Sequence, residues 1–302
     1  MRSLLAVLLV SVLVGGPALA QGFGEGRFGP PPEAPGSEEA ARHGRFFYHD
    51  QELKIALIGA FLLGAAALIR FGRPRWRPLF LLLSVAVLGF AMGGFLCPTS
   101  AVQNVILKGV SGYLVLFLLP VLAALLVGRL FCGYVCPFGA LQELIHIRKW
   151  SIRLPPKFWK AANFLRYAVL VYLVARVLYT NTLGFEDFSP FKPLFSFGGT
   201  AGALAFTAAF ALLSVVTFRP FCRTLCPYGA LLSLLSRISL FRLSATKGCT
   251  SCGLCAWVCP TAAMGKGAPD MTECFLCGLC RERCPRGALR FVPRFGPSES
   301  GG

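Results

Sequence analysis

Two short runs of cysteine near the C-terminus have the spacing of metal-thiolate ligands. They are Cys249-x2-Cys252-x2-Cys255-x3-Cys259-Pro260 and Cys274-x2-Cys277-x2-Cys280-x3-Cys284-Pro285. In this bacterial two-cluster pattern, the first three cysteines of a run bind one iron–sulfur cluster and the fourth binds the other. Thiolates suit iron–sulfur sites because they are soft, anionic donors. The spacing therefore predicts two [4Fe-4S] clusters and one-electron chemistry.

The crossed pattern also assigns the ligands of each cluster. Cluster 1 is predicted to be bound by Cys249, Cys252, Cys255 and Cys284, and cluster 2 by Cys274, Cys277, Cys280 and Cys259. Structural zinc needs four ligands grouped in pairs, which does not match two three-plus-one runs that both end in proline. Over residues 245–292 the segment resembles the bacterial dicluster ferredoxins. The prediction names a cofactor but neither an electron donor nor an electron acceptor.

A repeated sequence upstream supplies four more cysteines. Residues 131–141, FCGYVCPFGAL, recur as residues 221–231, FCRTLCPYGAL, with seven of eleven positions identical at an offset of 90. Residues four apart on a helix share one face, and proline suits the first turn of a new helix, which is predicted over 138–150 at the membrane interface. The cysteines of the repeat are Cys132, Cys136, Cys222 and Cys226.

The sequence leaves three interpretations of these four thiols open. They are buried thiols in a structural turn, or a redox-active or metal-binding pair in each copy. In the third interpretation the two copies face each other and form one four-cysteine site for a cluster or a metal. Stable disulfides are not expected, because we predict that both copies lie on a reducing cytoplasmic face.

The rest of the chain has the composition of a membrane protein. Of its 302 residues, 55% are hydrophobic and only 14% are charged, whereas about 25% are charged in an ordinary soluble protein. Apolar runs of about the length that a helix needs to cross hydrocarbon lie at 53–70, 79–96, 111–130, 164–180 and 201–218. These runs predict five membrane-spanning helices.

The N-terminus has the pattern of a secretory signal peptide at residues 1–20, with an uncleaved anchor helix as the alternative. The chain would then emerge on the exoplasmic side. Lys and Arg are abundant in the loops predicted to be cytoplasmic, which are 70–78, 129–166 and 219–247. The opposite loops carry only Lys108 and Lys192, as the positive-inside rule requires. Topology thus explains most of the +17 charge, and no nucleic-acid partner is expected.

We therefore expect an all-α transmembrane bundle of five spans after a signal peptide, joined to a small α+β dicluster ferredoxin domain. The predicted location is the cell inner membrane, multi-pass, with an exoplasmic N-terminus after cleavage and a cytoplasmic ferredoxin domain. The predicted boundaries are 1–20 for the signal peptide, 21–52 for an exoplasmic linker, 53–243 for the transmembrane domain, 244–295 for the ferredoxin domain and 296–302 for the tail.

Twin Cys-x3-Cys-Pro motifs after predicted spans, followed by a dicluster ferredoxin, resemble the NapH/MauN family of membrane ferredoxins and the C-terminal half of NosR-type proteins. The resemblance covers roughly residues 75–292. It implies electron transfer from the quinol pool toward an exported reductase. The implied partners are membrane lipid, a quinone and an exoplasmic or membrane redox partner. Residues 21–52 are too few for the flavin domain of NosR, so no flavin is expected. The absence of a C-x-x-C-H motif argues against c-type haem.

Two alternative functions stay open. The CcoG family, a membrane metal-reductase and oxidase-assembly factor, resembles this chain in its Cys-Pro motif and its ferredoxin. Metalloenzyme assembly or metal reduction is therefore the first alternative, and a redox-sensing membrane anchor is the second. Quinol oxidation also needs proton acceptors, and we consider Glu143 and His146 inside and Glu186 and Asp187 outside. No other catalytic residue is predicted.

Overall fold

The computed structural model describes residues 51–71, 76–92, 105, 112–152, 156–180, 190–195, 200–246, 248–265 and 268–294. The predicted signal peptide, nearly all of the linker, the tail, Glu186 and Asp187 lie outside these described residues. The chain divides into two units, 1–48 and 49–302. Every described helix and strand belongs to the second unit.

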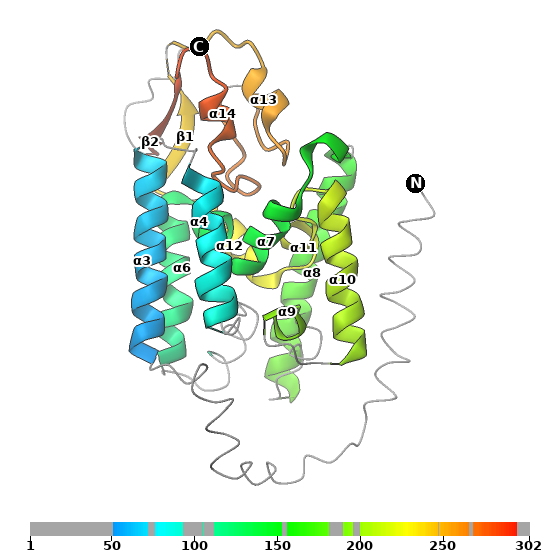
Figure 1. The fold of residues 1–302 in the computed structure, drawn as a ribbon. Helices are drawn as coiled ribbons and strands as arrows, with labels where there is room; N and C mark the ends of the chain where they lie inside the picture. Colours follow the sequence, from blue (N-terminus) through cyan, green and yellow to red (C-terminus); the bar gives the residue numbers. More distant parts are fainter. Residues whose placement is uncertain are drawn as a thin grey trace, which may run out of the picture. The chain divides into compact units, whose positions relative to one another are not determined.

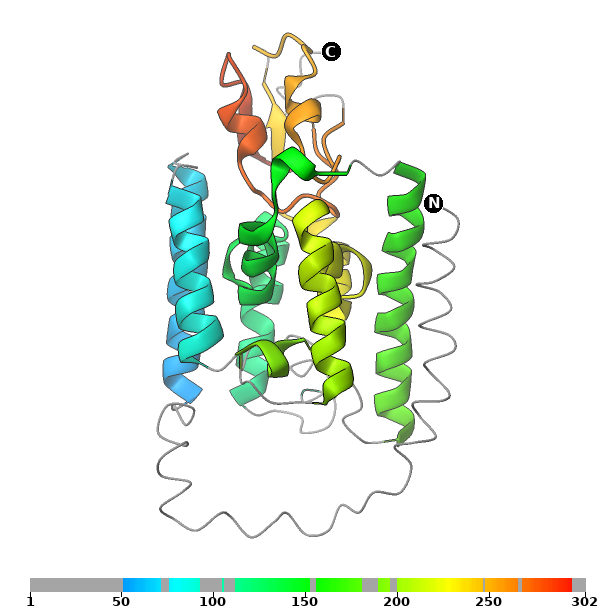
Figure 2. The same ribbon diagram turned by 45° about the vertical axis from the view of Figure 1, so that its right-hand side comes forward.

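Apolar helices that run roughly parallel to one another form the larger part of this unit (Figure 1 and Figure 2). They are α3 (Gln51–Arg70), α4 (Arg77–Ser84) with the π-helix η2 (Val85–Ala91), α6 (Gly112–Val127), α8 (Pro156–Thr180) and α10 (Ala201–Val216). Each one overlaps a predicted span. Only Glu52–Arg70 and Ala161–Thr180 are long and apolar enough to cross a membrane, and the other three are shorter. The five-span prediction is therefore not confirmed.

Each copy of the repeat forms two short helices that meet at its second cysteine. The first copy forms the π-helix η3 (Phe131–Val135) and α7 (Pro137–Ile145), and the second forms α11 (Pro220–Thr224) and α12 (Pro227–Ser236). The second cysteine has extended backbone and caps the next helix, which begins with proline. Proline is favoured there because the first helical N–H has no partner within the helix.

Helix α7 is shorter than the predicted helix over 138–150. It ends at Ile145 and is followed by a 3-10 turn, η4 (Arg148–Trp150). The N–H groups of Ile147 and Ile152 donate instead to the carbonyl oxygens of Val215 and Val216, at 3.1 and 2.9 Å. The last carbonyls of a helix lack partners within that helix, so these bonds cap α10 and draw the chain out of α7.

The C-terminal part is a small α+β unit. Strands β1 (Phe241–Ala245) and β2 (Leu289–Pro293) pair antiparallel, with Phe241 opposite Pro293. Helices α13 (Leu254–Val258) and α14 (Leu279–Glu282) lie between them in the sequence. Strand β1 begins three residues before the predicted boundary at 244, because the sheet needs its first strand from the segment after α12.

Two glycines start the short helices of the C-terminal unit. Gly253 and Gly278 have φ values of 75° and 79°, and each directly precedes a helix, α13 or α14. This left-handed conformation is accessible to glycine without steric cost. The same turn therefore recurs after the second cysteine of each run.

The C-terminal unit packs against the helical part through one of its two cysteine runs. Phe275 and Leu276 belong to the same hydrophobic core as Phe131 and Phe138 of the repeat. A separate small core contains Leu243, Met264 and Leu289. A short helix, α9 (Phe191–Phe195), joins the larger core through two buried aromatic rings. The second run thus contributes two side chains to the core of the helices, whereas the end of the first run is held by a 3.1 Å hydrogen bond from Arg223 to the carbonyl of Thr261.

Candidate functional site

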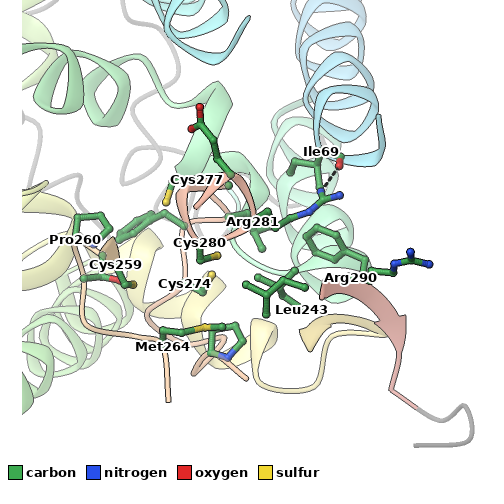
Figure 3. Close-up of a pocket in the computed structure, with 18 of the residues that line it drawn as sticks. Ile69, Leu243, Cys259, Pro260, Met264, Cys274, Cys277, Cys280, Arg281 and Arg290 are labelled. Atoms are coloured by element: carbon green, nitrogen blue, oxygen red, sulfur yellow. Dashed lines mark hydrogen bonds between the residues drawn. The ribbon is translucent and has the colours of Figure 1, made fainter. Parts of the chain in front are cut away.

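The four cysteines predicted to bind cluster 2 line one cavity of about 350 Å³ (Figure 3). They come from the segment after α13, the segment before α14 and α14 itself, and they are Cys259, Cys274, Cys277 and Cys280. Leu243 and Met264 also line this cavity. Four soft thiolate donors around one partly apolar cavity fit a [4Fe-4S] cluster.

Burial controls the protonation of these thiols. Desolvation raises the pKa of Cys280 to about 12, and the negative charge of Cys277 adds to the effect. The pKa of Cys274 is also raised, again by burial and then by Cys277. Metal ligation needs the thiolate, so binding of a cluster here releases protons.

The cysteines predicted to bind cluster 1 are more open to solvent. Cys249 and Cys252 are exposed, whereas Cys255 and Cys284 are partly buried. Cys255 and Cys284 pack against the small core beside the sheet. Cys255 also lies within electrostatic range of Cys249 and Cys252. The first run therefore exposes Cys249 and Cys252 and packs Cys255 at the edge of the small core.

The four cysteines of the repeat lie together in the protein interior. Cys132, Cys136 and Cys222 are 5–8% exposed and Cys226 is partly buried. Cys226 lies within electrostatic range of the other three, and its Sγ accepts a 3.3 Å hydrogen bond from the N–H of Gly229. The two copies, 90 residues apart in sequence, thus meet at their thiols.

No three Cys, His, Asp or Glu side chains among the described residues converge closely enough to hold a single metal ion. A cubane cluster carries its thiolates on separate iron atoms, so its ligands lie farther apart than those of one ion.

Five arginines that belong to the predicted basic loops are buried, which their position in a loop did not predict. Each is at most 6% exposed, and they are Arg77, Arg129, Arg166, Arg219 and Arg223. Arg129 and Arg219 each lie three residues before the first cysteine of a copy. The repeat therefore extends upstream to an arginine, and this signal was present in the sequence.

Glu143 holds two of these arginines. Its carboxylate lies 3.0 Å from Nη2 of Arg77 and 2.6 Å from Nη2 of Arg219. Burial opposes ionisation, but the two guanidinium groups outweigh it and hold the pKa of Glu143 below its ordinary value. Glu143 is thus a structural carboxylate at neutral pH, which argues against the predicted role as proton acceptor.

His146, the other predicted inside acceptor, is packed against the end of α10. Its Nδ1 lies 3.1 Å from the carbonyl oxygen of Ser214. Its ring meets Phe218 edge to face, with the centroids 5.7 Å apart. These contacts give His146 a structural role in packing α7 against the end of α10.

The second cysteine run and the first copy of the repeat are in direct contact. A Cβ on Gly133 would lie 2.2 Å from the carbonyl oxygen of Phe275, so only glycine fits there. The hydroxyl of Tyr134 donates a 3.1 Å hydrogen bond to the carbonyl of Leu276. Glu273, next to Cys274 in sequence, pairs with Arg166 at 2.5 Å. The predicted cluster 2 loop thus rests on the repeat.

Comparison with known proteins places the chain in a family. The family described as "4Fe-4S binding domain" matches residues 109–155 and 200–245, which contain the two copies of the repeat. The uncharacterized protein MJ0750 of Methanocaldococcus jannaschii is 32% identical over 208 residues, which are 66% of this chain and 87% of that protein. MauN of Methylobacillus flagellatus, a methylamine utilization ferredoxin-type protein, is 29% identical over 58% of this chain and 59% of its own length. The regulatory protein NosR of Stutzerimonas stutzeri is 32% identical over 50% of this chain and 23% of its own length.

The chain belongs to the membrane ferredoxin-type family of MauN and NosR. This confirms the family predicted from the twin Cys-x3-Cys-Pro motifs. As a member of that family, the chain is an iron–sulfur protein of the ferredoxin type. No solved structure matches it.

Proposed function

We propose that this chain is a multi-pass inner-membrane protein that links the quinol pool to an exported reductase by one-electron transfer. A bound [4Fe-4S] cluster supplies one-electron oxidation and reduction. The eight C-terminal cysteines would hold two such clusters, with the ligand sets predicted from their spacing.

The exposed apolar surface of the long helices carries the membrane part of this proposal. Only 28% of the apolar stretch of α3 and 17% of that of α8 is buried within the protein. Leu63, Phe164 and Leu212 are exposed by 72–74%. Leaving apolar surface in water costs roughly 25 cal/mol per Å², and soluble monomers rarely expose large apolar patches. Lipid is the environment that such helices need.

The attachment of the C-terminal unit supports its predicted side of the membrane. Arg281 donates a 2.7 Å hydrogen bond to the carbonyl oxygen of Ile69, at the C-terminal end of α3. The loop after α3 contains Arg73 and Arg75. Basic loops are retained on the cytoplasmic side, so a ferredoxin domain bonded to the C-terminal end of α3 would also be cytoplasmic.

The burial of the repeat thiols argues against the assembly alternative. A thiol that receives copper from a carrier must be accessible, because thiol exchange depends on access. Three of the four repeat cysteines are 5–8% exposed, and Cys226 is partly buried. Electron transfer needs no such access to the thiols.

Anaerobic EPR of the purified chain, with and without menaquinol, tests the proposed function. The proposal expects reduced-cluster signals that grow when menaquinol is added, with at least about eight irons per chain. Clusters that are reduced by dithionite but stay silent to menaquinol would contradict it. Uptake of copper by the repeat thiols in the same preparation would then favour the assembly alternative.

A further inference from the structure

We propose that the repeat binds a third iron–sulfur cluster, shared between its two copies and enclosed by Arg129 and Arg219. The ligands would be Cys132, Cys136, Cys222 and Cys226. This site is separate from the eight C-terminal cysteines, so the inference extends the proposed function without depending on its quinol.

The same backbone hydrogen bond fixes the second cysteine in both copies of the repeat. The N–H of Cys136 donates to the carbonyl of Phe131 at 2.9 Å, and the N–H of Cys226 donates to that of Phe221 at 3.1 Å. Both bonds span five residues, as in a π-turn, a feature that is frequent at functional sites. Two equivalent frames thus present equivalent thiol pairs.

The arginine of each copy also lies against a glycine of the other copy. A Cβ on Gly139 of the first copy would lie 3.0 Å from Nη1 of Arg219 in the second copy. A Cβ on Gly229 of the second copy would lie 3.3 Å from Nη2 of Arg129 in the first copy. Each copy therefore provides a glycine that leaves room for the guanidinium of the other, and the thiols share one site between them.

A thiol of the second copy faces the first. The Sγ of Cys222 lies 3.5 Å from the position that a Cβ on Gly139 would occupy. Cys136 lies within electrostatic range of both Cys132 and Cys222. The thiols of the two copies thus lie close enough to interact electrostatically, and one of them contacts the opposite copy.

Buried positive charge at this site calls for an anionic occupant. Arg129 is fully buried, and it has no carboxylate partner among the described residues. Its Nε and Nη2 also lack hydrogen-bond partners there. Arg219 shares the single carboxylate of Glu143 with Arg77. An uncompensated buried charge is strongly destabilising. Neutral thiols or disulfides would leave Arg129 without a compensating charge among the described residues.

A cluster satisfies these requirements better than a single ion does. A [4Fe-4S] core with four thiolates is anionic, and it spreads its ligands over separate irons. The described side chains show no convergence of the kind that a mononuclear site needs. The family match to residues 109–155 and 200–245 is described as 4Fe-4S binding, which supports this choice.

The third site would lie directly beneath the cluster 2 loop. The ring of Phe275, the residue after Cys274, lies 4.2 Å from the guanidinium carbon of Arg129 and 5.2 Å from that of Arg219. Phe275 therefore links the predicted cluster 2 loop to both arginines of the third site. The helical part of the molecule would then contain a redox centre of its own.

Iron and acid-labile sulfide in the full-length chain, purified anaerobically, test the proposal. Three cubane clusters give about twelve of each per chain, and two clusters give about eight. About eight irons with four free repeat thiols, with two cystines, or with zinc or copper at the repeat would overturn the third cluster. That result would leave the two C-terminal clusters, and with them the proposed function, intact.

Variants locate the additional iron. Replacing the four repeat cysteines by serine is expected to lower the count from about twelve to about eight. Cys252→Ser, at an exposed C-terminal ligand, is the matched control, and it should remove a different EPR signal. If the quadruple variant does not fold, Arg129→Met replaces it, with Arg129→Lys as control. Arg129→Met is expected to lower most the reduction potential of the additional cluster, whose signal persists in Cys252→Ser. A change confined to the C-terminal clusters, or an unchanged potential for every cluster, would contradict the proposal.

Discussion

The two cysteine groups of this chain are held in opposite ways. The C-terminal cysteines follow one another within 36 residues, between 249 and 284, in a unit whose separate core has three buried side chains. The repeat cysteines come from copies 90 residues apart and lie in the main hydrophobic core with buried arginines. A local spacing specifies ligands before folding, whereas a site shared between distant copies exists only in the folded protein.

Removal of iron should reveal the largest difference between the C-terminal unit and the helical part that holds the repeat. The C-terminal unit has so small a core that metal binding must supply part of its folding free energy. We expect the paired amides of β1 and β2 to lose hydrogen-exchange protection by about 100-fold or more in the iron-free chain, which corresponds to about 3 kcal/mol. The helices α3 and α8 should keep their protection. Equal protection of the strands with and without iron would contradict this difference.

Glu143→Gln tests the ion pairs that support the repeat. Breaking a buried pair by removing one partner leaves Arg219 uncompensated and is expected to cost about 3–5 kcal/mol in the free energy of unfolding. Denaturant unfolding in detergent measures this loss. Glu52→Gln, at an exposed position on α3, is the control and should change stability by less than about 0.5 kcal/mol. Similar losses in both variants would refute the proposed role of Glu143.

The difference in free energy of unfolding between wild type and Glu143→Gln should depend on pH. The folded-state pKa of Glu143 lies below its ordinary value, so its contribution to stability is complete above the unfolded pKa of about 4.3. That contribution is lost as the pH falls through the lower folded pKa. The stability difference between wild type and Glu143→Gln should therefore be constant from about pH 6 to 8 and shrink below about pH 4. A difference that shrinks instead as the pH rises would have the wrong sign.

Gly133→Ala tests the contact between the two groups. The new methyl would meet the backbone carbonyl of Phe275, and overpacking of this kind costs about 1–3 kcal/mol. Gly59→Ala is the control, because nothing lies within 4 Å of its Cβ and alanine favours a helix by about 0.5–1 kcal/mol. Unfolding of both variants in denaturant measures the effect. Unchanged stability in Gly133→Ala would mean that the second run does not rest on the repeat.

Tyr134→Phe is expected to have the smallest effect. Burial raises the pKa of Tyr134 to about 12, so its hydroxyl is protonated and donates to Leu276. The variant keeps the ring, and therefore its contact with Arg77, but loses the hydrogen bond. A loss of about 0.5–1.5 kcal/mol is expected for a bond of this type. No loss in the same unfolding assay would place the hydroxyl in contact with solvent.

The sequence predicts what depends on local pattern. The assignment of the eight C-terminal cysteines to two clusters rests on spacing alone and stays a prediction, although four of them, Cys259, Cys274, Cys277 and Cys280, line one cavity. The five apolar runs each contain a helix because hydrophobicity decides that at short range. Hydrophobicity alone did not predict the length of three of these helices, which are shorter than 18 residues among the described residues.

The buried arginines show what the sequence alone does not reveal. Arg129 and Arg219 lie in basic loops, where a topological role explains any arginine equally well. Their burial depends on Gly139 and Gly229, each in the opposite copy of the repeat. The role of Glu143 likewise depends on arginines 66 and 76 residues away in the sequence. Such contacts are decided by the tertiary fold rather than by local spacing.

Menaquinol-driven reduction in proteoliposomes tests the central claim most directly. The full-length chain, reconstituted anaerobically, is mixed with menaquinol, and the cluster absorbance is followed by stopped flow, with dithionite defining complete reduction. We expect menaquinol to bleach a substantial part of the dithionite amplitude, because the proposed function has the clusters accept electrons from the quinol pool. Full bleaching by dithionite with none by menaquinol would contradict a quinol-linked electron-transfer protein.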